Sequence, residues 1–452
     1  YFAASDLWHC GTHGGDGYFR RAKYGGKCVK IHIKNGQLVD PKNNVNSKND
    51  VYIAAGKIIS IGQAPDGFHA NQTIDATGLI VCPGFVDLSA RLREPGSIYK
   101  ATLVSELQAA AAGGVTSLAC TPDTQPVLDE PGLVEMLKHR AKQINLVNVY
   151  PLGALTQKLE GKLLAELCSL TAAGCVGFSQ ADQAITDTQV LWRAFEYAST
   201  FGYTLFLRAE DHYLAKDGVA HDGEVASRLG LKGIPTAAEA LSIASILRIA
   251  LETKTRVHLC RISSAEGVEL VRQAKKNGAL VTADASINHI HLSDNDIGYF
   301  NAYAHLKPPL RNTRDRDALC QGLNDGTIDA ICSDHTPVND DAKLLPFTQA
   351  EAGAVGLELL LPLSLKWAKM QKSNLCDAIA KITQHPANIL GITAGDLSIN
   401  SDADIAIFDP NFAWKVDAKN LKSHSKNTPF LGLEVIGKVY YTLLHGQITY
   451  QA

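Results

Sequence analysis

Hydrophobic and polar positions alternate at both ends of the chain. VKIHIKNGQLVD (29–40) alternates around Asn35 and the glycine that follows it, and DVYIAAGKIISIG (50–62) alternates around a second glycine. Near the other end, DADIAIFDP (402–410) and GKVYYTLLHGQITYQA (437–452) show the same pattern. Alternation with period two around such turns is typical of β-hairpins. We therefore predict hairpins at both ends and expect these ends to build one small β-sandwich domain together.

Between the ends, short apolar runs alternate with longer amphipathic stretches. Eight runs have the length of buried strands: 79–89, 115–123, 147–156, 174–180, 203–211, 256–264, 279–286 and 329–337. Helical periodicity separates them, as in TLVSELQAAAAGG (102–114), GLVEMLKHRAKQ (132–143) and AEALSIASILRIALET (238–253). Eight such alternations predict an α/β protein with a (β/α)8 TIM barrel, whose mouth is lined by the polar residues that end each strand.

These patterns divide the chain into four parts. We predict a disordered or artefactual leader (1–28), the first part of the β-domain (29–78), the barrel (79–392) and the second part of the β-domain (393–452). The leader lacks a starting Met and shows no period, so we expect the natural protein to begin at Val29. Its His9, Cys10 and His13 could imitate a metal site, but we expect none in a glycine-rich segment.

Composition narrows the class of protein. The 452 residues are 46% hydrophobic and 20% charged, and 43 Lys plus Arg against 46 Asp plus Glu give a net charge of −3. This balance provides no basic field for nucleic acid, and no apolar run approaches the ~18 residues of a membrane span. The ten cysteines include no Cys-x-x-Cys pair, which favours reduced thiols and a cytoplasmic location.

A series of motifs identifies a family resemblance. PGFVDLSARLREPG (83–96) resembles the first-strand signature of the amidohydrolase superfamily, in its dihydroorotase branch. Further matches follow in the family's order from Val29 to the end: 153–156 (GALT), 177–179 (GFS), 223–231, 308–311 (PPLR), 333–337 (SDHTP), 356–358 (GLE) and 426–430 (KNTPF). The resemblance implies a zinc centre whose activated water attacks a cyclic amide carbonyl, or the reverse ring closure.

The family's metal ligands are replaced in this chain. Ser89 and Arg91 stand at the two strand 1 histidines, and Gln180 with Ala181 stands at the strand 4 carboxylate. Arg208 and Arg261 stand at the strand 5 and strand 6 histidines, and only the strand 8 carboxylate, Asp334, is retained. His258 lies three residues before Arg261. Arginine has no acceptor and serine is a poor zinc ligand, so we expect no metal and no other cofactor.

The family's substrate contacts have changed as well. Arg93 keeps the position of an arginine that grips the substrate carboxylate, but Asp123 stands where the family has Asn. Lys307 replaces the Asn before PPLR, and Val338 replaces a His after the SDHTP motif. Because a carboxylate repels the substrate carboxylate, we expect poor recognition of dihydroorotate.

The three arginines at former histidine positions have two interpretations. They pair with carboxylates, for which Asp334, Asp182 and Glu210 are the candidates, because an unpaired buried charge is costly. Alternatively, with Arg93 they form a pocket for a phosphate or carboxylate effector, which would make the protein a ligand-binding regulator.

Two histidine motifs could suggest catalysis. His335 beside Asp334 looks like a catalytic pair, but we expect a buried histidine that hydrogen-bonds to the backbone. Asn288, His289 and His291 look like a ligand cluster, and we expect them to be structural.

The resemblance leads to a functional hypothesis. A chain with the family's folding motifs but without its ligands resembles the inactive dihydroorotase homologues of some bacteria, which bind aspartate carbamoyltransferase and hold its trimers in a larger assembly. We therefore expect a pseudoenzyme that assembles with the aspartate carbamoyltransferase catalytic chain in pyrimidine biosynthesis, forms a homo-oligomer and binds neither nucleic acid nor membrane. The alternative is a cyclic amide hydrolase with an atypical or metal-independent centre that uses Asp334, His335 and Arg93.

Overall fold

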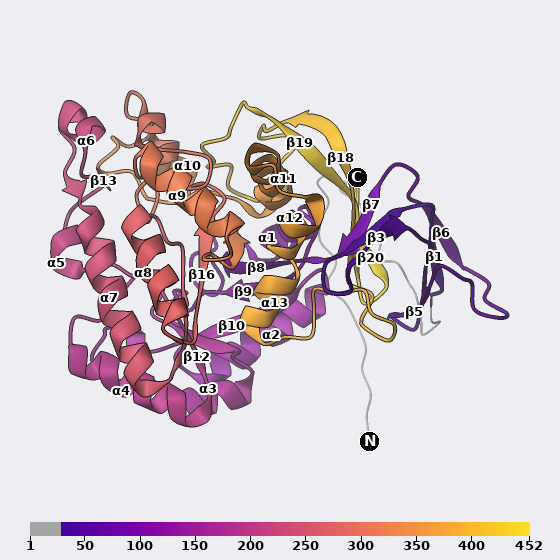
Figure 1. The fold of residues 1–452 in the computed structure, drawn as a ribbon, viewed down its shortest axis with the longest axis horizontal. Helices are drawn as coiled ribbons and strands as arrows, with labels where there is room; N and C mark the ends of the chain where they lie inside the picture. The colour runs from indigo at the N-terminus through magenta and orange to yellow at the C-terminus, as the bar shows by residue number, and fades with distance from the viewer. Residues whose placement is uncertain (1–28) are drawn as a thin grey trace, which may run out of the picture.

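The computed structural model describes residues 29–452. The predicted leader, 1–28, with His9, Cys10 and His13, lies outside the described residues. Figure 1 shows the helix-covered barrel on the left and the β-sandwich on the right. Within 29–452, none of the helices combines the length and the apolar character that a bilayer crossing requires.

Eight parallel strands form the barrel, in the order β17-β16-β15-β12-β11-β10-β9-β8. They are β8 (Phe85–Ala90), β9 (Val115–Cys120), β10 (Asn148–Ala154), β11 (Gly177–Ser179), β12 (Thr204–Leu207), β15 (Arg256–Leu259), β16 (Val281–Ser286) and β17 (Ala330–Cys332). The two outer strands meet where Ala90 bridges His335 and the His335 amide donates to the Ser89 carbonyl at 3.0 Å. All eight predicted strands are thus present, and the TIM barrel is confirmed.

One main helix follows each barrel strand. These helices are α1 (Leu103–Ala112), α2 (Pro131–Ile144), α3 (Leu167–Ala173), α4 (Thr188–Phe201), α7 (Thr236–Thr253), α8 (Ala265–Lys276), α9 (Thr313–Asn324) and α11 (Leu360–Gln371). Local sequence fixes their starts: Thr102 and Ser105 form a capping box at α1, and the Asp187 carboxylate accepts from two amides of α4. Their apolar faces pack on the outside of the barrel in one continuous core.

Shorter elements lie in the loops that connect the main strands and helices, and after the last main helix. They are α5 (His212–Ala215), β13 (Ala220–His221), α6 (Glu224–Leu229), β14 (Gly233–Ile234), α10 (Asp340–Leu344), α12 (Leu375–Ala380), α13 (Gln384–Leu390), and the 3-10 turns η1 (Gln157–Leu159), η2 (Asp294–Ile297), η3 (Ala302–Ala304) and η4 (Leu357–Leu359). Helix α13 contributes Ala387 and Leu390 to the apolar cluster inside the barrel, which also contains Val86, Leu152 and Phe206.

The two ends of the chain form the predicted β-sandwich. One sheet has the order β5-β4-β1-β6 and the other β20-β19-β18-β7-β2-β3. The strands are β1 (Ile31–Lys34), β2 (Gln37–Asp40), β3 (Val45–Lys48), β4 (Val51–Ala54), β5 (Lys57–Ile61), β6 (Gln72–Asp75), β7 (Ile80–Pro83), β18 (Ile405–Lys415), β19 (Glu434–Leu444) and β20 (Gln447–Gln451). Ile33 and Ile53 of the first sheet pack against Val81 and Ile405 of the second.

Three details of the predicted organisation are wrong. The Asn35 turn does not close a hairpin, because β1 pairs with β4 and β6 while β2 pairs with β3 and β7 in the other sheet. The barrel does not begin at residue 79, because β7 pairs with β18 and β2 and the chain enters the barrel only after Gly84. Residues 421–430 belong spatially to the barrel, since Asn427 bonds to the loops that surround its mouth.

Candidate functional site

The charged side chains that follow the barrel strands meet at the barrel mouth. They are Arg91 after β8, Asp123 after β9, Asp182 after β11, Arg208 and Glu210 after β12, Arg261 after β15, and Asp334 after β17. Several of these strand ends turn sharply, because Ala181, Arg261 and Asp334 have left-handed φ values of 50°, 55° and 49°. Such backbone conformations are costly for side-chain-bearing residues and are held here by the surrounding fold.

Asp182 lies at the centre of this network. Its carboxylate accepts from Nη2 of Arg91 at 2.8 Å and from Nη2 of Arg261 at 2.5 Å, and Nε of Arg208 lies 2.9 Å from Oδ1. The three arginines are almost completely buried, whereas the Asp182 side chain is 22% exposed. One carboxylate thus joins the arginines of three different strands.

A second ring of carboxylates completes the pairing. Arg208 donates two hydrogen bonds of 2.8 Å to Glu210, and Arg261 Nη1 donates to Asp334 at 2.9 Å. Arg91 Nε donates to Asp123 at 2.7 Å. Four carboxylates therefore face three guanidinium groups, so the buried charge is compensated.

The pKa values follow from burial and from these contacts. Burial by itself raises the pKa of Asp182, but the guanidinium groups of Arg261, Arg91 and Arg208 overcome it and hold the pKa well below its ordinary value. At Asp334 burial dominates, and its pKa stays raised although Arg261 and Arg91 oppose the shift. All three arginines remain charged, because the carboxylates raise their pKa values against the effect of burial.

The contacts test the first interpretation of the arginines, while the effector pocket stays a prediction. Pairing with Asp334, Asp182 and Glu210 is confirmed. The sequence reasoning missed one pair, because Asp123 was interpreted only as repelling a substrate, while it accepts from Arg91. Most guanidinium donors are already used by protein acceptors, which leaves few for an added anion.

The remaining former ligand positions carry neutral, buried side chains. Gln180 accepts from the Thr156 hydroxyl at 3.0 Å and donates to the Leu159 carbonyl at 2.9 Å, so its amide is held away from the arginines. Ser89 is 4% exposed, and its carbonyl helps to close the barrel. Neither position brings a charged ligand to the mouth.

His335 does not form a pair with Asp334. Its Nδ1 accepts from the Gly356 amide at 3.2 Å, so Nε2 carries the proton and donates to Glu106 of α1 at 2.6 Å. Glu106 also accepts from the Ser423 hydroxyl at 2.7 Å. The structural interpretation of His335 is confirmed, and its carboxylate partner on α1 was not foreseen.

Of the family's substrate positions, Asp123 joins the network, whereas the side chains of Arg93, Lys307 and Val338 do not. Arg93 turns away to donate to the Pro337 carbonyl at 2.9 Å, and its nearest carboxylate, Glu351, is 3.9 Å distant. The Lys307 carbonyl accepts from Arg261 at 3.3 Å, while its side chain is exposed. Val338 is fully buried.

The other histidine cluster is structural, as expected. His289 Nε2 lies 3.0 Å from the Pro308 carbonyl and His291 Nε2 lies 2.8 Å from the Leu363 carbonyl. Burial lowers the pKa of each to about 4, so both are neutral, and each donates its Nε2 proton to a backbone carbonyl.

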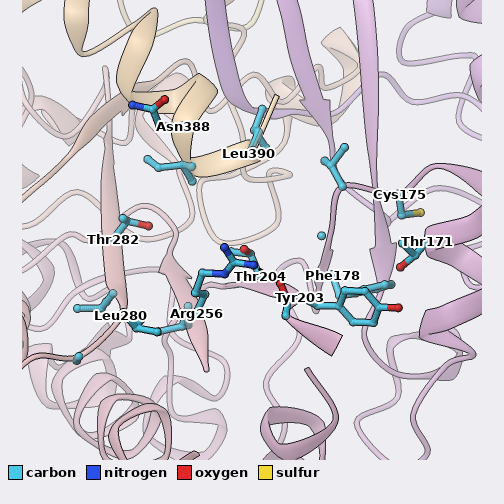
Figure 2. A pocket seen from close by; sticks show the side chains of 18 residues that line it. Thr171, Cys175, Phe178, Tyr203, Thr204, Arg256, Leu280, Thr282, Asn388 and Leu390 are labelled. Carbon is cyan, nitrogen blue, oxygen red and sulfur yellow. Dashed lines mark hydrogen bonds between the residues drawn. The ribbon is translucent and has the colours of Figure 1, made fainter. Parts of the chain in front are cut away.

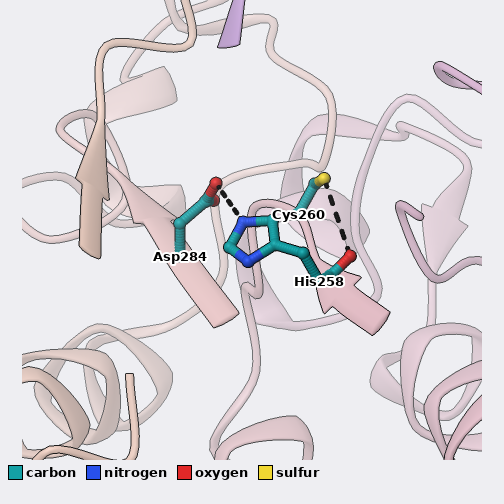
Figure 3. A group of neighbouring side chains, drawn as sticks. All are labelled: His258, Cys260 and Asp284. Atoms are coloured by element: carbon teal, nitrogen blue, oxygen red, sulfur yellow. Dashed lines mark hydrogen bonds and ion pairs between the residues drawn. The ribbon is translucent and has the colours of Figure 1, made fainter. Parts of the chain in front are cut away.

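A group of possible metal ligands lies inside the barrel, below the arginines. Figure 3 shows His258 and Cys260 of the β15 segment beside Asp284 of β16, with ligand atoms within 4.8 Å of one another. His258 already uses both ring nitrogens, Nδ1 with Thr282 at 2.8 Å and Nε2 with Asp284 at 2.9 Å. Asp284 also accepts from the Arg261 amide at 2.6 Å. These groups satisfy one another as a hydrogen-bonded chain.

The KNTPF motif supports the mouth. Asn427 is buried, accepts from the Val338 amide at 3.1 Å and donates to the carbonyls of Thr336 and Gly353 at 3.1 and 3.0 Å. It therefore fixes the loop that follows Asp334. The motif was visible in the sequence, but its role depends on contacts across about ninety residues, which no local pattern shows.

Comparisons with known proteins agree with this architecture. A family model described as dihydro-orotase-like matches residues 78–267. A dihydroorotase-like protein of Pseudomonas aeruginosa is 40% identical over 94% of this chain and all of its own length, and a dihydroorotase of a Geobacter species is 40% identical with the same coverage. The solved L-hydantoinase (dihydropyrimidinase) of Arthrobacter aurescens has a TM-score of 0.83 at 25% identity, and covers 92% of this chain and 95% of its own.

Proposed function

The chain belongs to the dihydroorotase-like family of cyclic amidohydrolases, and we propose that it is a non-catalytic member that serves as an assembly partner. The observation that carries this proposal is the buried network in which Arg91, Arg208 and Arg261 share Asp182. It fills the place where the family's chemistry would occur.

The residues of the mouth do not fit the zinc centre that the family resemblance implies. Zinc needs nitrogen, thiolate or carboxylate lone pairs, and guanidinium groups offer none. The retained carboxylate, Asp334, and the other carboxylates of the mouth are engaged by guanidinium groups, so a dication could bind them only by breaking these ion pairs. We therefore propose that the mouth binds no metal and has no other cofactor.

The aspartate carbamoyltransferase catalytic chain is the partner that we propose, within pyrimidine biosynthesis. Support comes from the resemblance to inactive homologues with that role and from large apolar side chains that the barrel loops expose. Tyr299 is 91% exposed and Leu344 of α10 is 82% exposed. A protein partner that covered these side chains would remove their apolar surface from water. We also propose a homo-oligomer and, from the eight free cysteines among the described residues, a cytoplasmic location.

Sedimentation velocity tests the assembly role. The protein is mixed with the aspartate carbamoyltransferase catalytic chain of the same organism, and we expect a species heavier than either component. Leu344→Asp and Leu433→Asp are compared, because both leucines are exposed but belong to different elements, Leu344 to α10 and Leu433 to the loop before β19. The variant that abolishes the heavy species locates the contact. If the wild-type mixture sediments as its separate components, the assembly role is refuted.

The second candidate function is a cyclic amide hydrolase with an atypical centre. It is favoured by the relatives that are named dihydroorotase at 40% identity. The proposed groups do not converge, however, since His335 bonds to Glu106 and Arg93 to a backbone carbonyl. Turnover of dihydroorotate that disappears in Asp334→Ala would establish this function in place of the proposed one.

A further inference from the structure

A cavity of about 550 Å³ opens at the end of the barrel opposite to the arginine network. It lies between the first residues of β11, β12, β15 and β16 and the C-terminal end of α13 (Figure 2). In TIM-barrel proteins the chemistry belongs to the other end, so this cavity is separate from the family's active site. Its size is within the range of small-molecule sites.

The cavity combines apolar walls with a single fixed charge. Val176, Phe178, Val257, Leu280 and Leu390 are among the apolar residues that line it. Leu280 is 53% exposed, which leaves apolar surface in contact with solvent. No acidic side chain lines the cavity, and Arg256 is its one charged residue. Arg256 is exposed, so the cavity is open to solvent at this point. An apolar wall beside one accessible cation is suited to an anion that carries an apolar body.

Polar groups gather around Arg256. Thr204 lies directly opposite Arg256 in the parallel pairing of β12 with β15, and both line the cavity. Figure 2 shows the Arg256 guanidinium inside the cavity, with Asn388 of α13 also at its wall. Within residues 29–452, the protein acceptor for this guanidinium is the Gly202 carbonyl, which bonds to Nη2. This bond uses one of the two N–H groups of Nη2, so the other Nη2 N–H remains, together with Nη1 and Nε, for a two-point contact with a ligand.

We propose that this cavity binds a small organic monoanion, whose carboxylate meets Arg256 and whose apolar body packs against Val176 and Leu280. A guanidinium binds a carboxylate through two parallel hydrogen bonds, which a neutral amide cannot reproduce. A single cation favours one negative charge over a polyphosphate. The site does not depend on catalysis or on assembly, and so goes beyond the proposed function.

The cavity is connected to the barrel interior through Thr282. This residue lines the cavity, and its hydroxyl lies 2.8 Å from His258 Nδ1, the first bond of the chain that leads through Asp284 to the Arg261 amide. Thr282, at the cavity wall, therefore lies three hydrogen bonds from Arg261, a member of the mouth network. This continuity makes the His258 ring a local reporter of occupancy, by its NMR signals.

Calorimetric titration of the full chain tests the proposal. Benzoate and hexanoate serve as aromatic and aliphatic probes, and benzamide is the neutral control. We expect saturable binding of at least one carboxylate, about tenfold or more weaker in Arg256→Gln, because a charge-assisted pair is lost. Arg193→Gln removes an exposed arginine of α4 outside the cavity and is expected to bind like wild type.

Two further measurements keep the test decisive. If Arg256→Gln fails to fold, Thr204→Val takes its place in the test. This substitution removes a lining hydroxyl with little change in volume and is expected to weaken carboxylate binding. The proposal is overturned if neither probe binds saturably at about 10 mM, or if Arg256→Gln and Arg193→Gln bind equally well. Equal binding of benzoate and benzamide would also overturn it, since the charge would then contribute nothing.

Discussion

Asp182→Asn is the substitution that tests the arginine network most severely. It keeps the shape of the side chain but removes the negative charge that Arg91, Arg208 and Arg261 share at 2.5 to 2.9 Å. Breaking a buried ion pair by removing one partner costs about 3–5 kcal/mol, because the remaining charge stays buried. The Asp182 side chain is 22% exposed, so water relieves part of this cost and we expect the lower end of the range.

Chemical unfolding at neutral pH measures this loss. The folded pKa of Asp182 lies well below 3.8, so its stabilisation is present above the unfolded pKa and is lost only as pH falls through the folded value. The deficit of Asp182→Asn is therefore expected to stay constant from neutral pH down to about 4. Asp217→Asn is the matched control, because Asp217 and its partner Lys232 are 70% and 59% exposed and contribute little. Equal losses in the two variants would refute the reasoning.

Three further outcomes follow from other buried or reactive groups. Burial raises the pKa of Glu358 from 4.5 to about 7. The stability that the protonated Glu358 contributes is therefore complete below pH 4.5 and is lost as the pH rises through about 7. Glu358→Gln should flatten the dependence of the unfolding free energy on pH between these values, and an unchanged profile would contradict the expectation. Asn427→Ala should cost about 2–4 kcal/mol in unfolding free energy, because three buried hydrogen bonds are lost; a loss within measurement error would show that the loop needs no anchor. Cys168 is the exposed thiol among the described cysteines, and hydrogen bonds from Tyr197 and Tyr203 lower its pKa. It should be alkylated first in the native protein, which Cys168→Ser would abolish and mass mapping would check.

The barrel could be predicted from the sequence because its strands are buried on both faces. Such strands read as continuous apolar runs, and amphipathic helices separate them regularly. The arginine pairs could also be predicted, because a buried guanidinium requires a carboxylate. Glu210 lies two residues after Arg208, and Asp182 follows the end of a predicted barrel strand. Periodicity therefore identified those helices and strands whose buried face is visible in their own sequence.

Pairing between distant segments could not be predicted in the same way. The Asn35 turn has the sequence of a hairpin, but local alternation does not say that β1 and β2 enter different sheets. Glu106 gives no local sign that it meets His335, which lies 229 residues away. The cavity around Arg256 could not be predicted from the sequence either, because residues of four strands and α13 line it.

The central claim is that the arginine network has replaced the metal centre of the family, and metal content tests it most directly. The protein is expressed without a histidine tag in zinc-supplemented medium, dialysed, and analysed by inductively coupled plasma mass spectrometry. We predict zinc far below one ion per chain. Zinc retained in stoichiometric amount would contradict the account, and its loss in His258→Gln would then place the metal at the cluster of His258, Cys260 and Asp284.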